Sequence, residues 1–155
     1  AHRVLIYREL KGLKSSITVS RVYPVMLENG WEFQDGTYID HLKGRRFLHQ
    51  VYRHADPTYT GRGTVPTLSD KAQNTIVNNE SSEIIRIFDE VLGTSGPDLR
   101  PVALRDQIEH LNQRIYRDIN NGVYRAGFAT SQSAYEQACD SLFAALDWLE
   151  KQLRP

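Results

Sequence analysis

This sequence has a single cysteine, no formal net charge and no long apolar run. Its single cysteine, Cys139, cannot form a disulfide within the chain, which is compatible with a reducing compartment. Basic and acidic residues balance at 19 each, so no general electrostatic attraction draws the chain to nucleic acid or to an anionic membrane. We therefore expect neither of these as a partner.

No apolar run approaches the roughly 20 residues needed to cross a bilayer. The first residues have neither the apolar core nor the cleavage site of a signal peptide, so a cytoplasmic protein is the default expectation. An apolar content of 40% and a charged content of 25% exclude a disordered chain and favour a globular one. The uncapped start at Ala1 and the end at Pro155, directly after a helical pattern, suggest that both ends are cuts.

The histidines do not indicate a metal site, because no two of them have the i, i+4 spacing that places two ligands on one helix face. The five are His2, His41, His49, His54 and His110. Cys139 falls on the apolar side of a predicted helix, which favours a buried structural thiol over a nucleophile. No phosphate-binding glycine loop, serine nucleophile or zinc-protease motif is present. We expect no metal.

The first part of the chain, residues 1–92, mixes helical and strand patterns. The predicted helices cover residues 2–12, 45–54 and 80–92, the first ended by Gly12 and the last by Gly93. The predicted strands cover residues 17–23, 66–69 and 74–77, the last two joined by a polar turn. This order predicts a small α/β layer.

Residues 93–101 have the composition of a linker, and residues 102–155 form a second, helical part. An apolar stripe from Leu104 to Ile119 predicts one helix, which residues 120–122 end. Ser133 and Glu136 have the spacing of a capping box at the start of a second helix. Each helix carries one apolar stripe, so the pair needs further helices to cover it.

Two segments of the first part could bind a ligand. In the first, a cis bond before Pro66 would turn the amide and carbonyl of Val65 outward, toward an extended peptide-like ligand; the residues alone favour an ordinary trans turn. In the second, residues 78–84, polar groups at a helix start suit a carboxylate and Glu80 suits an ammonium group, as in an α-amino acid. A plain capping sequence explains this second segment equally well, and both interpretations stay open.

Eight segments carry a resemblance that runs through nearly the whole chain. They are Leu10–Leu13, Glu28–Trp31, Ala55–Pro57, Gly61–Arg62, Thr64–Pro66, Thr75–Ser81, Glu83–Arg86 and Asn120–Ala129. In this order and spacing they resemble the glutathionyl-hydroquinone reductases, the Xi class of the glutathione transferases. The segments Thr75–Ser81 and Asn120–Ala129 are specific to that class, whereas a Val-Pro near a Glu-Ser is shared more widely.

The resemblance implies an α/β thioredoxin-like N-terminal domain that lacks its first strand, over residues 1–92, and part of an all-α C-terminal domain over residues 102–155. It implies that Val65, before a cis Pro66, pairs with the cysteinyl backbone of glutathione. Glu80 and Ser81 would hold the γ-glutamyl end, and Trp31 and Arg62 would line the glycyl side. Tyr124 would reach the hydroquinone pocket and could donate a proton there.

The family's nucleophile is a cysteine in a Cys-Pro-Trp motif directly before the residues that match Ala1-His2-Arg3. The resemblance therefore implies that this chain lacks the nucleophile and is inactive alone. In the complete enzyme the thiolate attacks the sulfur of a glutathionyl-hydroquinone, and a second glutathione reduces the mixed disulfide.

The expected partners are glutathione and quinone conjugates, while the oligomeric state, including a homodimer, stays open. Two alternative functions also stay open. One is a non-catalytic glutathione-binding or interaction module, and the other is a thioltransferase that deglutathionylates other disulfides.

Overall fold

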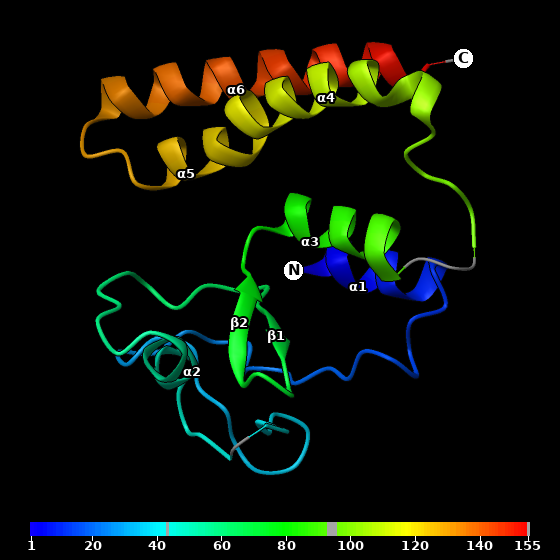
Figure 1. Cartoon of the computed structure of the whole chain (residues 1–155). Coiled ribbons are helices and arrows are strands. Elements are labelled where there is room, and N and C mark those ends of the chain that lie inside the picture. Colours follow the sequence, from blue (N-terminus) through cyan, green and yellow to red (C-terminus); the bar gives the residue numbers. More distant parts are fainter. Residues whose placement is uncertain (43, 93–95, 155) are drawn as a thin grey trace. The chain divides into compact units, whose positions relative to one another are not determined.

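The computed structural model describes residues 1–42, 44–92 and 96–154, and the chain divides into two compact units (Figure 1). Unit 1 is Ala1–Leu99 and unit 2 is Arg100–Pro155. Each unit is described by itself. The predicted linker, residues 93–101, and the predicted stop at Gly93 include positions outside the described residues, so the domain boundaries stay a prediction.

The described residues of unit 1 form three α-helices and one hairpin. Its elements are α1 (His2–Leu10), α2 (Leu48–Ala55), β1 (Leu68–Asp70), β2 (Thr75–Asn78) and α3 (Ser81–Ile87), which a π-helical turn, η1 (Phe88–Leu92), extends. Gly12 follows α1 at φ 67°, the left-handed conformation that ends many helices. The predicted end of the first helix at Gly12 is confirmed.

The strand predicted at 17–23 is wrong, because residue 17 lies in a bend and residues 18–23 belong to no regular element. Its β-branched residues are held by other contacts instead. Ile17 packs against the α1–α3 core and Val22 against the core around α2. The Arg8 guanidinium donates to the Ile17 carbonyl at 2.7 Å. A β-rich sequence becomes a strand only where a neighbouring strand pairs with it.

The predicted hairpin is confirmed, with strands shifted by one or two residues. β1 and β2 are antiparallel, pairing Ser69 with Ile76 and Asp70 with Thr75. The Asp70 carboxylate accepts from the N–H groups of Ala72 and Gln73 at 2.7 and 3.0 Å, which closes the turn without a glycine.

Two apolar clusters form the core of unit 1. The first joins α1 to α3 and η1, and consists of Val4, Tyr7, Leu13, Ile84 and Phe88. The second lies under α2 and consists of Phe33, Leu48, Val51 and Tyr52. Beside the first cluster, the Lys11 ammonium lies 2.8 Å from the Asp89 carboxylate, with side chains 6% and 11% exposed.

The regular elements in the described part of unit 2 are all helical. Its elements are η2 (Val102–Leu104), α4 (Arg105–Arg114), a π-helical stretch η3 (Ile115–Asn120), α5 (Asn121–Gly127) and the long α6 (Gln132–Leu153). The predicted end of the first helix at 120–122 is wrong, since α5 continues through it. Gly122 is buried, and a Cβ there would lie 3.4 Å from the Leu142 side chain of α6. This glycine therefore lies inside a helix, at its contact with α6, and does not end the helix.

The N-cap of α6 lies two residues before the predicted one. Ser131, with extended φ and ψ of −141° and 155°, accepts from the Ala134 N–H at 3.2 Å, so Ser133 lies inside the first turn. Cys139 on α6 is half-buried, not buried as predicted. Within the described residues, no helix has the length and apolar character required to cross a membrane.

Candidate functional site

The hydroxyl of Tyr52 connects the two segments that could bind a ligand. Tyr52 lies on α2 and is 3% exposed. Its hydroxyl donates to the Thr64 carbonyl at 2.8 Å and lies 3.0 Å from the Thr67 hydroxyl. It also accepts from the Asn79 side-chain amide at 3.2 Å. One buried hydroxyl thus fixes both ends of the turn 64–67 and the residue before Glu80.

The turn itself carries Val65 and Pro66. Their peptide bond is cis, as the resemblance implies, and the trans bond that the residues alone favoured is wrong. Val65 packs against the cluster under α2. Within the described part of the chain, neither the N–H nor the carbonyl of Val65 has a hydrogen-bond partner. A half-buried main chain with free polar groups can pair with a peptide-like ligand.

The pair Glu80–Ser81 opens α3. The Glu80 N–H donates to the Asn78 side chain at 2.7 Å, and the Glu80 carboxylate accepts at Oε1 from the N–H and hydroxyl of Ser82, both at 3.2 Å. Among the described residues, Oε2 of Glu80 has no hydrogen-bond partner. The carboxylate therefore caps the helix with one oxygen, which also satisfies the capping interpretation, and keeps the other for a cation.

Trp31 and Arg62 lie on the border of the same region. Trp31 is half-buried against the cluster under α2, and its carbonyl accepts from the Leu48 N–H at 2.9 Å. The Arg62 carbonyl accepts from the Tyr59 hydroxyl at 3.0 Å. The Tyr59 ring lies 5.0 Å from the Tyr52 ring. The side chain of Arg62 is exposed and can move to meet a ligand.

Tyr124 lies in unit 2, on α5. It is 64% exposed, and its ring stacks on that of Phe128 with centroids 6.2 Å apart and planes 8° apart. The structure therefore brings six of the seven predicted site residues together in unit 1. It leaves Tyr124 on a separate aromatic surface of unit 2.

Sequence reasoning missed two residues of this region. The apolar spacing of the helix indicates only that the Tyr52 ring is buried. It does not reveal that the hydroxyl bonds residues 12 to 27 positions away in the sequence. Arg3 was noted only as part of the first residues. Its guanidinium donates to the Ser81 hydroxyl at 3.0 Å across 78 residues, and no local pattern signals this contact.

One carboxylate beside the region has a shifted acidity. Asp56 follows α2, and its N–H donates to the Tyr52 carbonyl at 2.9 Å. The hydroxyl and then the N–H of Thr58, 2.7 and 2.9 Å from Asp56 Oδ1, lower the pKa of the Asp56 carboxyl below its ordinary value. Hydrogen bonds to the ionised form cause such a shift.

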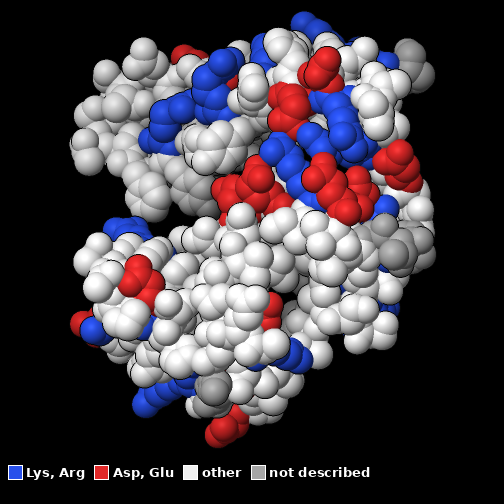
Figure 2. All heavy atoms as spheres, viewed as in Figure 1, with Lys and Arg blue, Asp and Glu red and all other residues white. Residues whose placement is uncertain are grey.

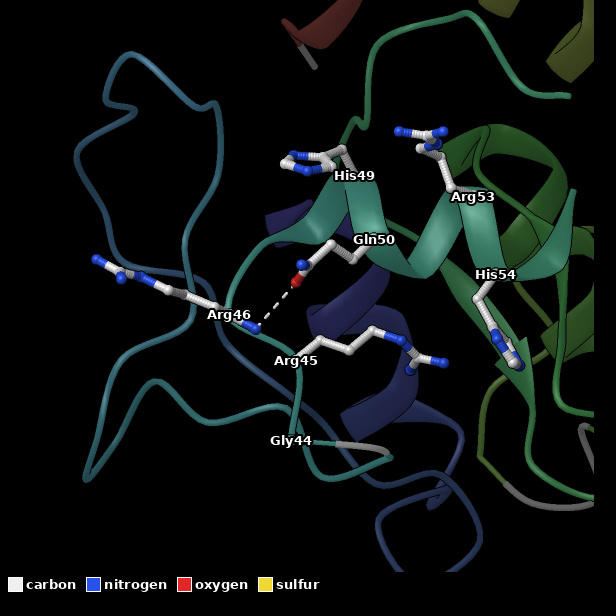
Figure 3. Close-up of a pocket in the computed structure, with 7 residues that line it drawn as sticks. All are labelled: Gly44, Arg45, Arg46, His49, Gln50, Arg53 and His54. Carbon is white, nitrogen blue, oxygen red and sulfur yellow. Dashed lines mark hydrogen bonds between the residues drawn. The ribbon is translucent and has the colours of Figure 1, made fainter. Parts of the chain in front are cut away.

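A shallow basic hollow of about 600 Å³ lies on the outer side of α2 (Figure 3). Figure 3 shows Arg46 and Arg53 pointing to different sides, while Arg45 points toward His54. Arg45 is paired with Asp40 at 3.5 Å and Arg46 with Glu32 at 2.9 Å. Cations that diverge and are already paired do not form an anion site.

On the face in Figure 2, acidic side chains lie beside basic ones where charged residues gather, and uncharged residues cover most of the rest. Among the residues that the structure describes, no group of three or more His, Cys, Asp or Glu is arranged to hold a metal ion. The hydrogen-bonded region around Tyr52 is therefore the arrangement with the clearest capacity to bind a ligand.

Comparison with known proteins gives the family. Residues 1–91 match the family described as "Glutathione S-transferase, N-terminal domain". A curated relative, glutathionyl-hydroquinone reductase PcpF of Sphingobium chlorophenolicum, is 54% identical over 99% of this chain and 50% of its own length. The chain spans about half the length of the curated relatives it matches.

Solved structures agree with this assignment. The glutathione-bound structure of YqjG, described as a glutathione transferase homolog from Escherichia coli, is 54% identical, with a TM-score of 0.91 over 97% of this chain and 51% of that one. The glutathione S-transferase Xi of Phanerochaete chrysosporium is 45% identical, with a TM-score of 0.91 over 98% and 55%. The predicted fold class is confirmed. The chain belongs to the glutathione S-transferase family, and it is similar to that family's glutathionyl-hydroquinone reductases and Xi-class members.

Proposed function

We propose that this chain forms part of a longer enzyme that uses glutathione to reduce glutathionyl-hydroquinones. The observation that carries the proposal is the Tyr52 hydroxyl, which holds the Val65 turn and the residue before Glu80 in one network. A peptide-like ligand with an α-amino-acid end needs both parts at once. The similarity to PcpF, a glutathionyl-hydroquinone reductase, supports the choice of reaction.

In this proposal, glutathione lies along the turn. Its cysteinyl main chain pairs with the free N–H and carbonyl of Val65, next to Pro66. Its γ-glutamyl ammonium group binds Oε2 of Glu80, and the α-carboxylate binds Ser81. Trp31 and Arg62 line the glycyl end, where the guanidinium can meet the terminal carboxylate. The ligand's ammonium group and its terminal carboxylate each meet an opposite charge of the protein, whereas the α-carboxylate meets the neutral hydroxyl of Ser81.

The nucleophile in this proposal is the cysteine of a Cys-Pro-Trp motif that precedes Ala1. The Arg3 guanidinium, in the first turn of α1, bonds the Ser81 hydroxyl, which supports a position for that cysteine close to the bound ligand. The site at the start of α1 would favour the thiolate, because the helix dipole and free N–H groups stabilise an anion.

The reaction then has two steps. The thiolate attacks the sulfur of the glutathionyl-hydroquinone, the sulfur–carbon bond breaks, and the ring carbon takes up a proton as hydroquinone leaves. A second glutathione thiolate attacks the mixed disulfide and releases oxidised glutathione and the free enzyme thiolate. Tyr124 donates a hydrogen bond or proton to an oxygen of the quinol, and the stacked ring of Phe128 extends the aromatic surface beside it.

The test uses the full-length protein with its cysteine intact. We expect glutathione-dependent release of hydroquinone from a glutathionyl-hydroquinone, which chromatography measures. Glu80→Gln removes the carboxylate charge that pairs with the ligand ammonium, and we expect at least about a tenfold loss of glutathione affinity. Arg53→Gln, on the basic hollow of the same unit, is the matched control and leaves the affinity unchanged.

Three outcomes separate this proposal from its rivals. No release of hydroquinone by the full-length protein refutes it. Glutathione binding that Glu80→Gln abolishes, without turnover of any conjugate, identifies a non-catalytic binding module. Reduction of a small glutathione mixed disulfide, without action on the hydroquinone conjugate, identifies a thioltransferase.

A further inference from the structure

We propose that Arg3 determines the specificity of the Glu80–Ser81 pair for ligands that carry an α-carboxylate. This inference rests on the proposed function and adds a residue to its γ-glutamyl subsite. It pairs the ligand's α-carboxylate with the guanidinium of Arg3. The ammonium and the α-carboxylate of the ligand then each meet an opposite charge of the protein.

The geometry comes from two helices of unit 1. Arg3 lies in the first turn of α1, and its Nη2 donates to Oγ of Ser81 at 3.0 Å. Ser81 is the first residue of α3, and α1 and α3 share the apolar cluster around Val4, Ile84 and Phe88. That buried contact fixes the distance between the guanidinium and the serine hydroxyl.

The direction of the hydrogen bond decides what Ser81 can do. Because the guanidinium only donates, the Ser81 oxygen accepts from Arg3, and the hydroxyl proton is left to donate. Its neighbour within the protein is Oε1 of Glu80, at a long 3.4 Å. An incoming carboxylate is a stronger acceptor at a shorter distance, so the hydroxyl can turn to it while the guanidinium stays beside both.

The charges of the three side chains match one ligand class. Glu80 offers Oε2 to a cation, and Arg3 is exposed, with four of its five N–H donors available after the bond to Ser81. Among the described residues, no acidic side chain forms an ion pair with Arg3. An α-amino acid end carries its ammonium and carboxylate groups on one carbon. Such a ligand suits Glu80 and Arg3, because both side chains contact the Ser81 hydroxyl.

A purely structural Arg3 would behave differently from a specificity-determining one. If Arg3 only linked α1 to α3, its loss would weaken all ligands of the subsite alike. If it meets the carboxylate, its loss weakens only the ligands that have this group. The ratio of two affinities therefore separates the roles, even where a variant is less stable.

The experiment measures binding to the full-length protein by calorimetry with two probes. One is glutathione, and the other is γ-aminobutyryl-cysteinyl-glycine, which lacks only the α-carboxylate. We expect Arg3→Gln to weaken glutathione about tenfold and the analogue less than about twofold. Arg3→Lys keeps the charge but lacks the planar guanidinium with its paired donors, so we expect an intermediate loss of affinity for glutathione. Arg21→Gln, an exposed arginine of the same unit, changes neither.

Equal weakening of both probes by Arg3→Gln, or no weakening of either, overturns the assignment of Arg3. These results leave the proposed function intact as long as the wild-type protein binds glutathione and acts on the conjugate. A wild-type protein that binds neither probe refutes the proposed function itself, together with the role of Arg3.

Discussion

The two units of this chain are stabilised by different kinds of contact. In unit 1, short elements are connected by long-range polar contacts, such as Tyr52 to Thr64 and Asn79, Lys11 to Asp89, and Arg3 to Ser81. In unit 2, long helices lie side by side, and the ion pairs of its described residues join positions one to nine apart in the sequence. Unit 1 therefore depends on single side chains, whereas unit 2 depends on repeated helical packing.

Burial follows the same division. Unit 1 holds two clusters with the fully buried Ile84 and Phe88, while the buried residues of the described part of unit 2 are Gly122 and Ala145. Small buried residues let helices approach, and large ones fill a core. Point substitutions should therefore have larger and more specific effects in unit 1.

The largest effect is expected from a substitution that breaks the buried ion pair of unit 1. Asp89→Asn removes the carboxylate charge that lies 2.8 Å from the Lys11 ammonium, which is 6% exposed and also donates to the Pro97 carbonyl at 3.2 Å. We expect the free energy of unfolding to fall by about 3 kcal/mol, because a buried charge loses its opposite charge. Urea unfolding of unit 1 can be followed through Trp31 in a Trp148→Phe background, because the sequence has two tryptophans.

The matched control is in unit 2. Glu150 and Arg154 form an exposed pair at 3.7 Å, with side chains 65% and 71% exposed, and such pairs contribute little. We expect no measurable change from Glu150→Gln. An effect of similar size at both pairs would remove the contrast between the units.

The second prediction concerns the buried hydroxyl at the proposed site. Tyr52→Phe removes one of two donors to the Thr64 carbonyl, which keeps the Thr67 hydroxyl, and leaves the Asn79 amide with the more distant Thr64 hydroxyl at 3.5 Å. We expect a loss of about 1–2 kcal/mol of stability. Because the hydroxyl holds the Val65 turn to the residue before Glu80, glutathione binding should weaken as well, as calorimetry on the full-length protein can measure. Tyr135→Phe in unit 2 should leave binding unchanged. Unaltered binding in Tyr52→Phe would show that the turn keeps its position without this bond.

These contrasts also explain how far the sequence could predict the molecule. Apolar spacing predicted α6, the helices of unit 1 and the hairpin, since these patterns are local. The strand at 17–23 was wrong because strand formation needs a partner that composition does not reveal. Val65 and Glu80 were found as candidates from their motifs, but the hydroxyl of Tyr52 that joins them, and the reach of Arg3 across 78 residues, come only from the folded chain.

The third prediction compares two glycines that were given the same role from the sequence. Gly12 has φ 67°, so Gly12→Ala forces a side chain into the left-handed region, and we expect a loss of about 1 kcal/mol. Gly122 is helical, and an added Cβ would lie 3.4 Å from Leu142. Gly122→Ala should therefore gain up to about 1 kcal/mol from helix propensity, whereas the larger Gly122→Leu should destabilise unit 2.

Thermal unfolding by circular dichroism measures both substitutions. Opposite signs for Gly12→Ala and Gly122→Ala support the assignment of Gly12 to helix termination and of Gly122 to a helix interior. A loss of similar size at both positions would contradict it.

The smallest effect is expected for two carboxylates, the half-buried Asp118 and the exposed Asp56, whose pKa values are lowered by different partners. In unit 2, hydrogen bonds from Arg117, at 2.7 and 2.9 Å, are the main cause of the lowered pKa of Asp118, and the charges of Arg117, Arg114 and Arg125 add to it. In unit 1, the neutral Thr58 lowers the pKa of Asp56. Both carboxyls stabilise the fold at pH values above the ordinary aspartate pKa, and this contribution is lost as the pH falls through the lowered value.

Salt should separate the two carboxylates. Because mobile ions screen exposed charges, about 1 M sodium chloride should move the pKa of Asp118 back toward its ordinary value and leave that of Asp56 nearly in place. Carboxyl chemical shifts followed by NMR over the acidic range measure both values in one sample. Arg117→Ala should raise the pKa of Asp118, and Thr58→Val that of Asp56. An equal salt response of the two carboxyls would mean that the charges around Asp118 add nothing to the hydrogen bond, and that local contacts control acidity in the same way in both units.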